Sequence, residues 1–178
     1  MPVLHDFFAS KTVVITGAAS GIGRALASVF ADLGCNVAIC DIDESALSDV
    51  ALQLKSTHPA LTLFTSVLDV ANKTDWETYL ADVASHCEHI DIVINNAGIE
   101  GSSQPAWASD DELLKRVMDV NFYGMVYGSK AALPYLTQRS WAALVNVSSV
   151  FGLVAPPNTA DYCAIDILPA LKGGDPCG

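Results

Sequence analysis

Residues 12–34 read TVVITGAASGIGRALASVFADLG and join three local patterns in the order strand, turn, helix. The run TVVIT is apolar and rich in β-branched residues, which predicts a strand buried on both faces. Residues 21–34 carry apolar side chains at helical spacing and end at Gly34, a helix stop. Between the two, glycines at positions 17, 21 and 23 predict a tight turn that opens the helix.

This glycine-rich turn has two interpretations. Glycine lets the backbone approach a pyrophosphate closely, and the N–H groups at a helix N-terminus attract its negative charge. The alternative is a tight turn with a structural role only. Asp41 ends the next apolar run 18 residues after Gly23, close to the spacing of about 20 residues expected of an acid that binds ribose. The alternative for Asp41 is an ordinary acidic residue at a helix N-terminus.

The alternation of strand and helix continues along the chain. The patterns predict further strands at 36–41, 61–70, 90–98 and 142–149, and helices at 43–58, 73–87 and 109–138. Strands separated by helices of this length indicate βαβ units, and hence an α/β fold with a parallel sheet of about five strands. Composition changes only near the end, so we predict one domain over residues 1–165 and a short divergent tail over 166–178.

The composition argues against several classes of partner. The chain has 178 residues, of which 51% are hydrophobic, enough for a domain with a buried core. Its formal net charge of −11 argues against nucleic acid or an anionic membrane surface as a partner. No apolar run reaches the ~18 residues that span a bilayer and no secretory signal is visible, so we predict a cytoplasmic protein. Five scattered cysteines without a CxxC pair indicate reduced thiols, and no metal site is predicted.

Five motifs occur together in a recognisable order. They are TGAASGIG at 16–23, LDV at 68–70, NNAG at 95–98, VNFYG at 120–124, and VNVSSVFG at 145–152 followed by Tyr162. With these motifs the chain resembles the short-chain dehydrogenase/reductase family over residues ~11–165. The resemblance implies a Rossmann-like, doubly wound parallel sheet. It also implies hydride transfer between a nicotinamide cofactor and a small-molecule alcohol or carbonyl substrate.

The resemblance implies a cofactor site that is built from three of these motifs and Asp41. The pyrophosphate would lie on the glycine-rich turn, the adenine beside the LDV motif, and the adenosine side near the NNAG motif. Asp41 predicts NAD rather than NADP, because a carboxylate accepts hydrogen bonds from the ribose 2′-OH and repels a 2′-phosphate. The implied cofactor-binding residues are Gly17, Ser20, Gly21, Ile22, Gly23, Asp41, Asp69, Val70, Asn95, Ala97 and Gly98.

The resemblance also implies a catalytic set. Tyr162 would be the general acid/base, and Ser149, 13 residues earlier, would polarise the substrate oxygen. Asn121 would support a water-linked proton path. The alternatives are a strand-end cap for Ser149 and a hydrogen bond at a helix bend for Asn121. The family has a lysine four residues after the tyrosine, where this chain has Asp166. On a helix, an aspartate one turn from Tyr162 disfavours the tyrosinate that a base near neutral pH requires.

The aspartate at position 166 leaves three functions open. They are a working NAD-dependent oxidoreductase, a non-catalytic dinucleotide-binding or interaction protein, and a marginally folded truncation product. The likeness to the family ends near Ala164, so we expect the later strands of the family fold to be missing. The strand at 142–149 would then be a sheet edge, and apolar residues of the 109–138 helix would be partly exposed. A homo-oligomer stays open, although the dimer interface usual in the family would be incomplete.

Overall fold

The computed structural model describes residues 2–152 and residue 162. The strands are β1 (Thr12–Thr16), β2 (Asn36–Asp41), β3 (Leu63–Val67), β4 (Ile92–Asn95) and β5 (Ala143–Asn146). The helices are α1 (Pro2–Phe8), α2 (Gly21–Asp32), α3 (Glu44–Thr57), α4 (Lys73–Cys87), α5 (Asp111–Val117) and α6 (Met125–Leu136), with 3-10 turns η1 (Ala106–Ala108) and η3 (Val150–Gly152). The predicted domain boundary at residue 165 lies outside the described residues and stays a prediction.

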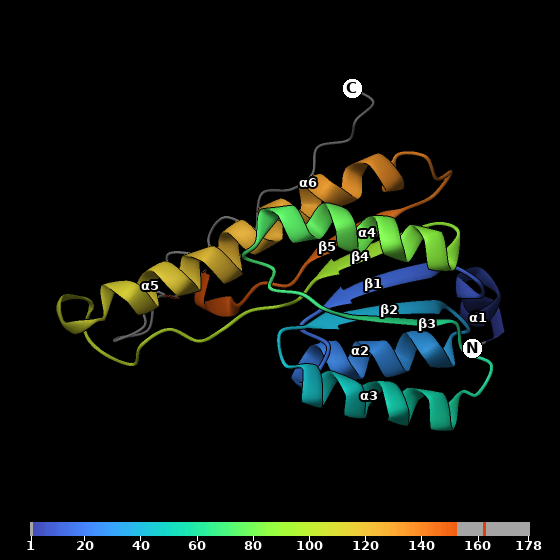
Figure 1. Cartoon of the computed structure of the whole chain (residues 1–178), viewed down its shortest axis with the longest axis horizontal. Helices are drawn as coiled ribbons and strands as arrows, with labels where there is room; N and C mark the ends of the chain where they lie inside the picture. Colours follow the sequence, from blue (N-terminus) through green and yellow to red (C-terminus); the bar gives the residue numbers. More distant parts are fainter. Residues whose placement is uncertain (1, 153–161, 163–178) are drawn as a thin grey trace.

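The five strands form one parallel sheet in the order β3-β2-β1-β4-β5. Helices α2 and α3 cover one face, and α4 and α6 cover the other (Figure 1). Central β1 is buried along its whole length, as its continuous apolar pattern predicts. Val13 and Ile15 join the core under α2 and α3, whereas Val14 joins the core under α4 and α6. The prediction of a Rossmann-like, doubly wound α/β fold is confirmed.

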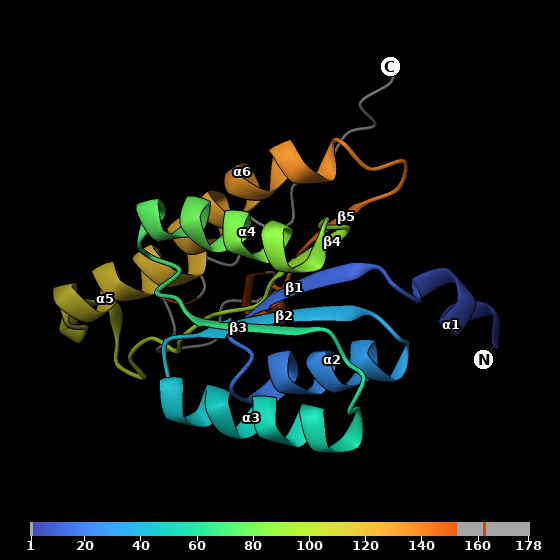
Figure 2. The ribbon, with the colours of Figure 1, turned by 45° about the vertical axis from the view of Figure 1, so that its right-hand side comes forward.

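The chain adds strands first on one side of β1 and then on the other. The chain runs from β1 outward through β2 to β3, then crosses to β4 and β5 on the other side of β1, and Figure 2 shows this arrangement from a second side. Connections that leave the sheet in opposite directions open a crevice at the carboxyl ends of the strands, where ligands bind in open α/β sheets. The topology therefore points to the ends of β1 and β4 as the place to look for a site.

Strand β5 forms an edge of the described sheet, as predicted. Leu144 and Val145 of β5 are 37% and 41% exposed, in contrast to the buried residues of β1 and β4. The helix predicted over 109–138 is observed as α5, the π-helical segment η2 (Met118–Gly124) and α6 in succession. Its apolar residues Met118, Phe122, Met125 and Val126 are half-buried, which agrees with the predicted partial exposure.

The amino end of the sheet is fixed by a buried carboxylate. Asp91 is 1% exposed and accepts hydrogen bonds from the Thr12 backbone N–H at 2.9 Å and from Arg139 Nε at 2.8 Å. Its Oδ2 also lies 3.1 Å from His89 Nε2. Helix α1, which the sequence patterns do not predict, packs at the same end through edge-to-face contacts of Phe7 and Phe8 with Trp141.

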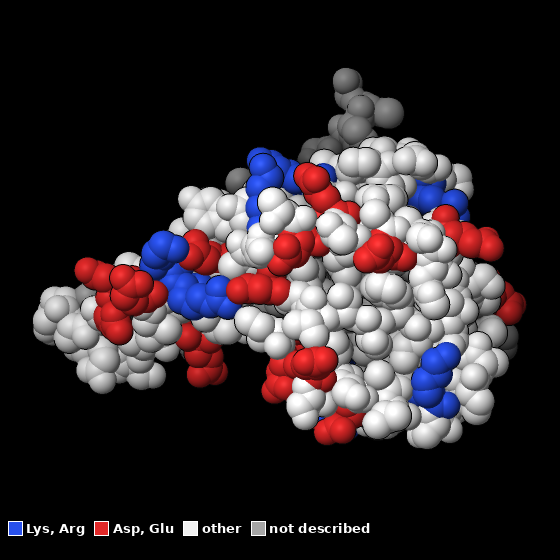
Figure 3. All heavy atoms as spheres, viewed as in Figure 1, with Lys and Arg blue, Asp and Glu red and all other residues white. Residues whose placement is uncertain are grey.

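The charge distribution agrees with the acidic composition. On the face drawn in Figure 3, acidic side chains are spread over the surface and basic side chains are scattered among them without forming a continuous patch. In the part of the chain that the structure describes, no helix is both long enough and apolar enough to cross a membrane.

Candidate active site

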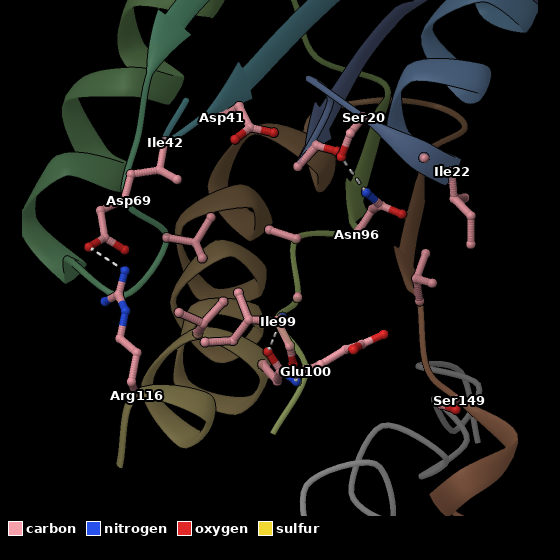
Figure 4. A pocket seen from close by; sticks show the side chains of 18 of the residues that line it. Ser20, Ile22, Asp41, Ile42, Asp69, Asn96, Ile99, Glu100, Arg116 and Ser149 are labelled. Carbon is pink, nitrogen blue, oxygen red and sulfur yellow. Dashed lines mark hydrogen bonds and ion pairs between the residues drawn. The ribbon is translucent and has the colours of Figure 1, made fainter. Parts of the chain in front are cut away.

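A cleft of about 650 Å³ opens at the carboxyl ends of the strands. It receives residues from the turn after β1, the end of β2, the segments after β3 and β4, the α5–η2 helix and the segment after β5 (Figure 4). Most of the residues predicted from the sequence therefore lie together, although they are spread over nearly the whole chain. The predicted residues in the lining are Gly17, Ser20, Gly21, Ile22, Asp41, Asp69, Val70, Ala97, Gly98, Asn121, Ser149 and Tyr162.

At two of its three glycines, the glycine-rich turn is packed so tightly that a side chain does not fit. Gly17 has a φ of +63°, and a Cβ there would lie 2.8 Å from Ala97 Cα. A Cβ on Gly23 would lie 2.2 Å from the Gly17 carbonyl oxygen. Gly21, with a φ of +51°, has no atom within 4 Å of its Cβ position among the described residues, so the turn is open on that side. The side chain of Ser20 makes no capping hydrogen bond at the start of α2 in the described structure. This uncapped helix N-terminus behind an open glycine turn fits a pyrophosphate.

Asn96 ties this turn to the end of β4. Its Nδ2 donates to the carbonyl oxygens of Thr16 at 2.8 Å and Gly17 at 3.2 Å. In return, Thr16 Oγ1 accepts hydrogen bonds from the N–H groups of Asn96 at 3.0 Å and Ala97 at 2.9 Å. The shape of the turn thus depends on a residue about 80 positions further along the chain.

Two of the predicted cofactor-binding residues do not reach the cleft lining. Gly23 lies behind the turn, where its missing side chain permits close packing. Asn95 is 6% exposed and faces α6, with Nδ2 donating to Asn146 Oδ1 at 2.8 Å and to Ser129 Oγ at 3.1 Å. The NNAG motif predicts Asn95 as a site residue, but its neighbour Asn96 is the asparagine that lines the cleft.

The Asp41 carboxylate is held by two backbone N–H groups and also lines the cleft. Its Oδ2 accepts a hydrogen bond from the Ala19 N–H at 2.9 Å, and its Oδ1 accepts one from the Asp43 N–H at 3.1 Å. The N-cap of α3 is Asp43, whose side chain accepts from the Ala46 N–H. The helix-terminal role considered as the alternative for Asp41 is therefore filled by Asp43. A half-buried Asp41 carboxylate at the end of β2 fits a ribose hydroxyl, since each oxygen can accept further hydrogen bonds.

The predicted catalytic residues lie at the other end of the cleft. Asn121 lies in η2, and its Oδ1 accepts from the Ile99 N–H at 2.9 Å while its Nδ2 donates to the Ile99 carbonyl at 3.0 Å. Ser149 Oγ accepts from the Phe151 N–H at 3.2 Å. The ring of Tyr162 makes an edge-to-face contact with Phe151, at 6.1 Å between ring centroids. Asp166 lies outside the described residues.

The thiol of Cys40, near the end of β2, is unreactive near pH 7. Cys40 precedes Asp41 in β2 and is fully buried, and this burial raises the pKa of its thiol to about 12. The thiol therefore stays neutral near pH 7 and is a poor nucleophile.

Among residues 2–152 and 162, no cluster of three histidine, cysteine or acidic side chains could hold a metal ion.

Comparison with known proteins identifies the class. The family model described as short chain dehydrogenase matches residues 11–165 of this Rossmann-like α/β chain. The chain therefore belongs to the short chain dehydrogenase family, an oxidoreductase family, as its motifs predict.

Two of the similar curated proteins are dehydrogenases. The chain is 35% identical over 162 residues to cis-4-hydroxycyclohexanecarboxylate dehydrogenase from Sinomonas cyclohexanicum, covering 90% of this chain and 64% of that protein. It is 29% identical over 164 residues to 2-dehydro-3-deoxy-L-rhamnonate dehydrogenase (NAD(+)) from Sphingomonas sp. (strain SKA58), covering 92% of this chain and 64% of that protein. The chain thus spans less than two thirds of the length of either relative.

Solved structures share the fold and show both nicotinamide dinucleotides. A short chain dehydrogenase/reductase from Burkholderia phymatum in complex with NAD matches with a TM-score of 0.86 and 31% identity, covering 90% of this chain and 56% of that chain. A short chain dehydrogenase from Escherichia coli CFT073 complexed with NADPH matches with a TM-score of 0.85 and 27% identity, covering 92% and 68%. The likeness alone does not separate NAD from NADP.

Proposed function

We propose that this chain binds NAD in preference to NADP, in a site suited to hydride transfer with a small alcohol or carbonyl compound. One observation carries the proposal. The glycine turn follows β1, Asp41 ends the adjacent β2, and Asp69 follows β3. All three share one cleft with Ser149 and Tyr162. A dinucleotide and a substrate can then meet in the same cleft.

The preference for NAD rests on Asp41. Its carboxylate is fixed by the N–H groups of Ala19 and Asp43, so it would need little reorganisation to accept from a ribose hydroxyl. A 2′-phosphate at the same place would meet a negative charge. Arg24 is the basic residue nearest the turn in sequence, and its guanidinium donates to Gln53 Oε1 at 2.5 Å rather than lining the cleft.

Two side chains, Tyr162 and Ser149, would carry out the chemistry. A bound nicotinamide would supply the hydride donor or acceptor. The Tyr162 hydroxyl would deliver a proton to the substrate oxygen, or remove it in the reverse direction. Ser149 would donate a hydrogen bond to that oxygen and polarise the carbonyl. Asn121 would act by holding the Ile99 segment of the cleft in place.

The aspartate at position 166 supports a second candidate, a dinucleotide-binding protein without turnover. A negative charge four residues after Tyr162 on a helix would oppose formation of the tyrosinate. The two candidates share the cofactor site and differ only in the proton transfer. Measuring the absorbance of reduced nicotinamide with a panel of secondary alcohols separates them. Turnover that disappears in Tyr162→Phe supports the first candidate, and binding without turnover supports the second.

The cofactor site is tested by a thermal melt of the purified chain with NADH or NADPH at millimolar concentration. A ligand selective for the folded state raises the melting temperature by mass action. We expect a cooperative transition whose melting temperature rises with NADH and rises much less with NADPH. A transition that responds to neither dinucleotide would contradict the proposal.

Substitutions at Asp41 should change the choice between the two dinucleotides. In Asp41→Asn, the side-chain oxygen still accepts from the Ala19 N–H, but the charge that repels a 2′-phosphate is gone. We expect the affinity for NADH to fall by about tenfold to a hundredfold and that for NADPH to stay or rise, since a lost charged hydrogen bond is worth roughly 1.5–3 kcal/mol. Asp41→Ala removes both roles and should also lower the melting temperature. Titration by fluorescence or calorimetry checks this, and an equal loss for both dinucleotides would make Asp41 purely structural.

A further inference from the structure

The ion pair between Arg116 and Asp69 crosses one end of the cleft. Arg116 lies in α5 and Asp69 follows β3, 47 residues away in sequence, and Arg116 Nη2 donates to Asp69 Oδ2 at 3.1 Å (Figure 4). Both residues line the cleft. The two side chains are 41% and 35% exposed, so the pair contributes little to the stability of the fold. The position of the pair in the cleft lining indicates a role in ligand binding instead.

The order of the strands decides which part of a dinucleotide lies beside this pair. The glycine turn follows β1, Asp41 ends β2, and Asp69 follows β3, and these three strands are neighbours in that order. If the pyrophosphate lies on the turn and the ribose at Asp41, then the base lies one strand further out, at Asp69. This step rests on the function proposed above.

The Asp69 carboxylate is held at both oxygens. Oδ1 accepts from the Ala71 N–H at 3.0 Å, and Oδ2 accepts from Arg116. One donor comes from the segment before α4 and the other from α5, so the plane of the carboxylate is fixed from two directions. A carboxylate oxygen can accept a second hydrogen bond. An oriented acceptor at this position suits the amino group of adenine, which donates, and does not suit a carbonyl oxygen in its place.

We propose that Arg116 is a specificity-determining residue that orients the Asp69 carboxylate to accept from the 6-amino group of the adenine base. Without Arg116, Asp69 keeps only the Ala71 hydrogen bond, and its second oxygen is free to rotate away from the base. Arg116 acts through Asp69 and is a positioning residue.

The probe is a pair of dinucleotides that differ at the 6-position of the base. NADH carries the amino group there, and reduced nicotinamide hypoxanthine dinucleotide carries a carbonyl oxygen, with a proton on the neighbouring ring nitrogen N1. Titration of the intact chain should show about tenfold tighter binding of NADH, since a charge-assisted hydrogen bond is lost in the analogue. In Arg116→Ala this ratio should fall below about threefold. Asp69→Asn, whose amide can donate to the carbonyl, should remove or invert the preference.

The neighbouring residue gives a matched control. Lys115→Ala removes the same charge from the same helix, and Lys115 pairs with Asp119 at 2.5 Å and does not line the cleft. It should keep the wild-type ratio, and Arg116→Lys should restore part of it. Equal loss of both dinucleotides in Arg116→Ala, or equal binding of both by the wild type, would overturn the proposal and leave the dinucleotide site standing. No binding of either by the wild type would overturn both.

Discussion

An alanine at position 23 should leave the chain with little affinity for NADH and a clearly lower melting temperature. The added Cβ would lie 2.2 Å from the Gly17 carbonyl oxygen, 2.9 Å from the Gly17 carbonyl carbon and 2.7 Å from Asn96 Nδ2. Two of these atoms are backbone, so the turn itself must move away from α2. We expect a loss of about 3 kcal/mol of stability from overpacking. The affinity for NADH should fall at least about a hundredfold, because the turn no longer presents its N–H groups to the pyrophosphate.

Gly21→Ala is the control that separates steric overlap from backbone strain. Gly21, unlike Gly23, has a positive φ, +51°, and apart from its chain neighbours and its own helix backbone no described atom lies within 4 Å of its Cβ position. Its replacement should cost about 1 kcal/mol of stability, from strain alone. Denaturant unfolding of both variants, with NADH titrations beside it, compares the two effects. If Gly23→Ala binds NADH within about threefold of the wild type, the turn after β1 is not the phosphate site.

The sequence predicted those parts of the site that depend on local patterns. The apolar run of β1 implied burial on both faces, and the spacing from Gly23 to Asp41 placed an acid at the end of the neighbouring strand. The spacing between Ser149 and Tyr162 also led to the prediction of two residues that line the cleft. In each case a periodic pattern or a short motif carries the information within one or two elements.

Asn96 could have been found from the alternation of β4. Ile92 and Ile94 face the core under α2 and α3, whereas Val93 faces the core under α4 and α6. With a period of two, Asn95 continues the series of Val93 and Asn96 continues that of Ile94. Asn95 therefore points toward α6, and Asn96 points toward the glycine turn. The signal was present in the strand, but the motif alone does not say which asparagine reaches the cleft.

Arg116 and α1 could not be predicted in this way. Arg116 belongs to none of the sequence motifs, and its partner Asp69 is 47 residues away. Helix α1 has seven residues and is fixed by contacts of Phe7 and Phe8 with Trp141. The π-helical segment η2 likewise interrupts a helix that the apolar pattern predicts as continuous. Such features depend on tertiary contacts that no local pattern encodes.

Replacing Trp76 by alanine should remove a large part of the free energy of unfolding. Trp76 is 1% exposed and lies in α4, where its ring fills the space left by the missing side chain of Gly128 in α6. A Cβ on Gly128 would lie 2.6 Å from Trp76 Cη2, which shows how closely the two helices approach. Loss of a buried tryptophan costs about 3–5 kcal/mol, and domains of this kind are stable by only about 5–15 kcal/mol. Urea unfolding followed by circular dichroism measures the loss.

The effect should also reach the cofactor cleft, because Trp76 Nε1 donates to the Val70 carbonyl at 3.0 Å and Val70 lines the cleft. Trp76→Phe retains most of the packing and removes this hydrogen bond, so it should cost about 1–3 kcal/mol and weaken NADH binding. Trp107→Ala is the matched control, since Trp107 is 89% exposed and its loss should change stability by less than about 0.5 kcal/mol. If Trp76→Ala were as mild as Trp107→Ala, α4 and α6 would not share the tightly packed core that supports the Val70 side of the cleft.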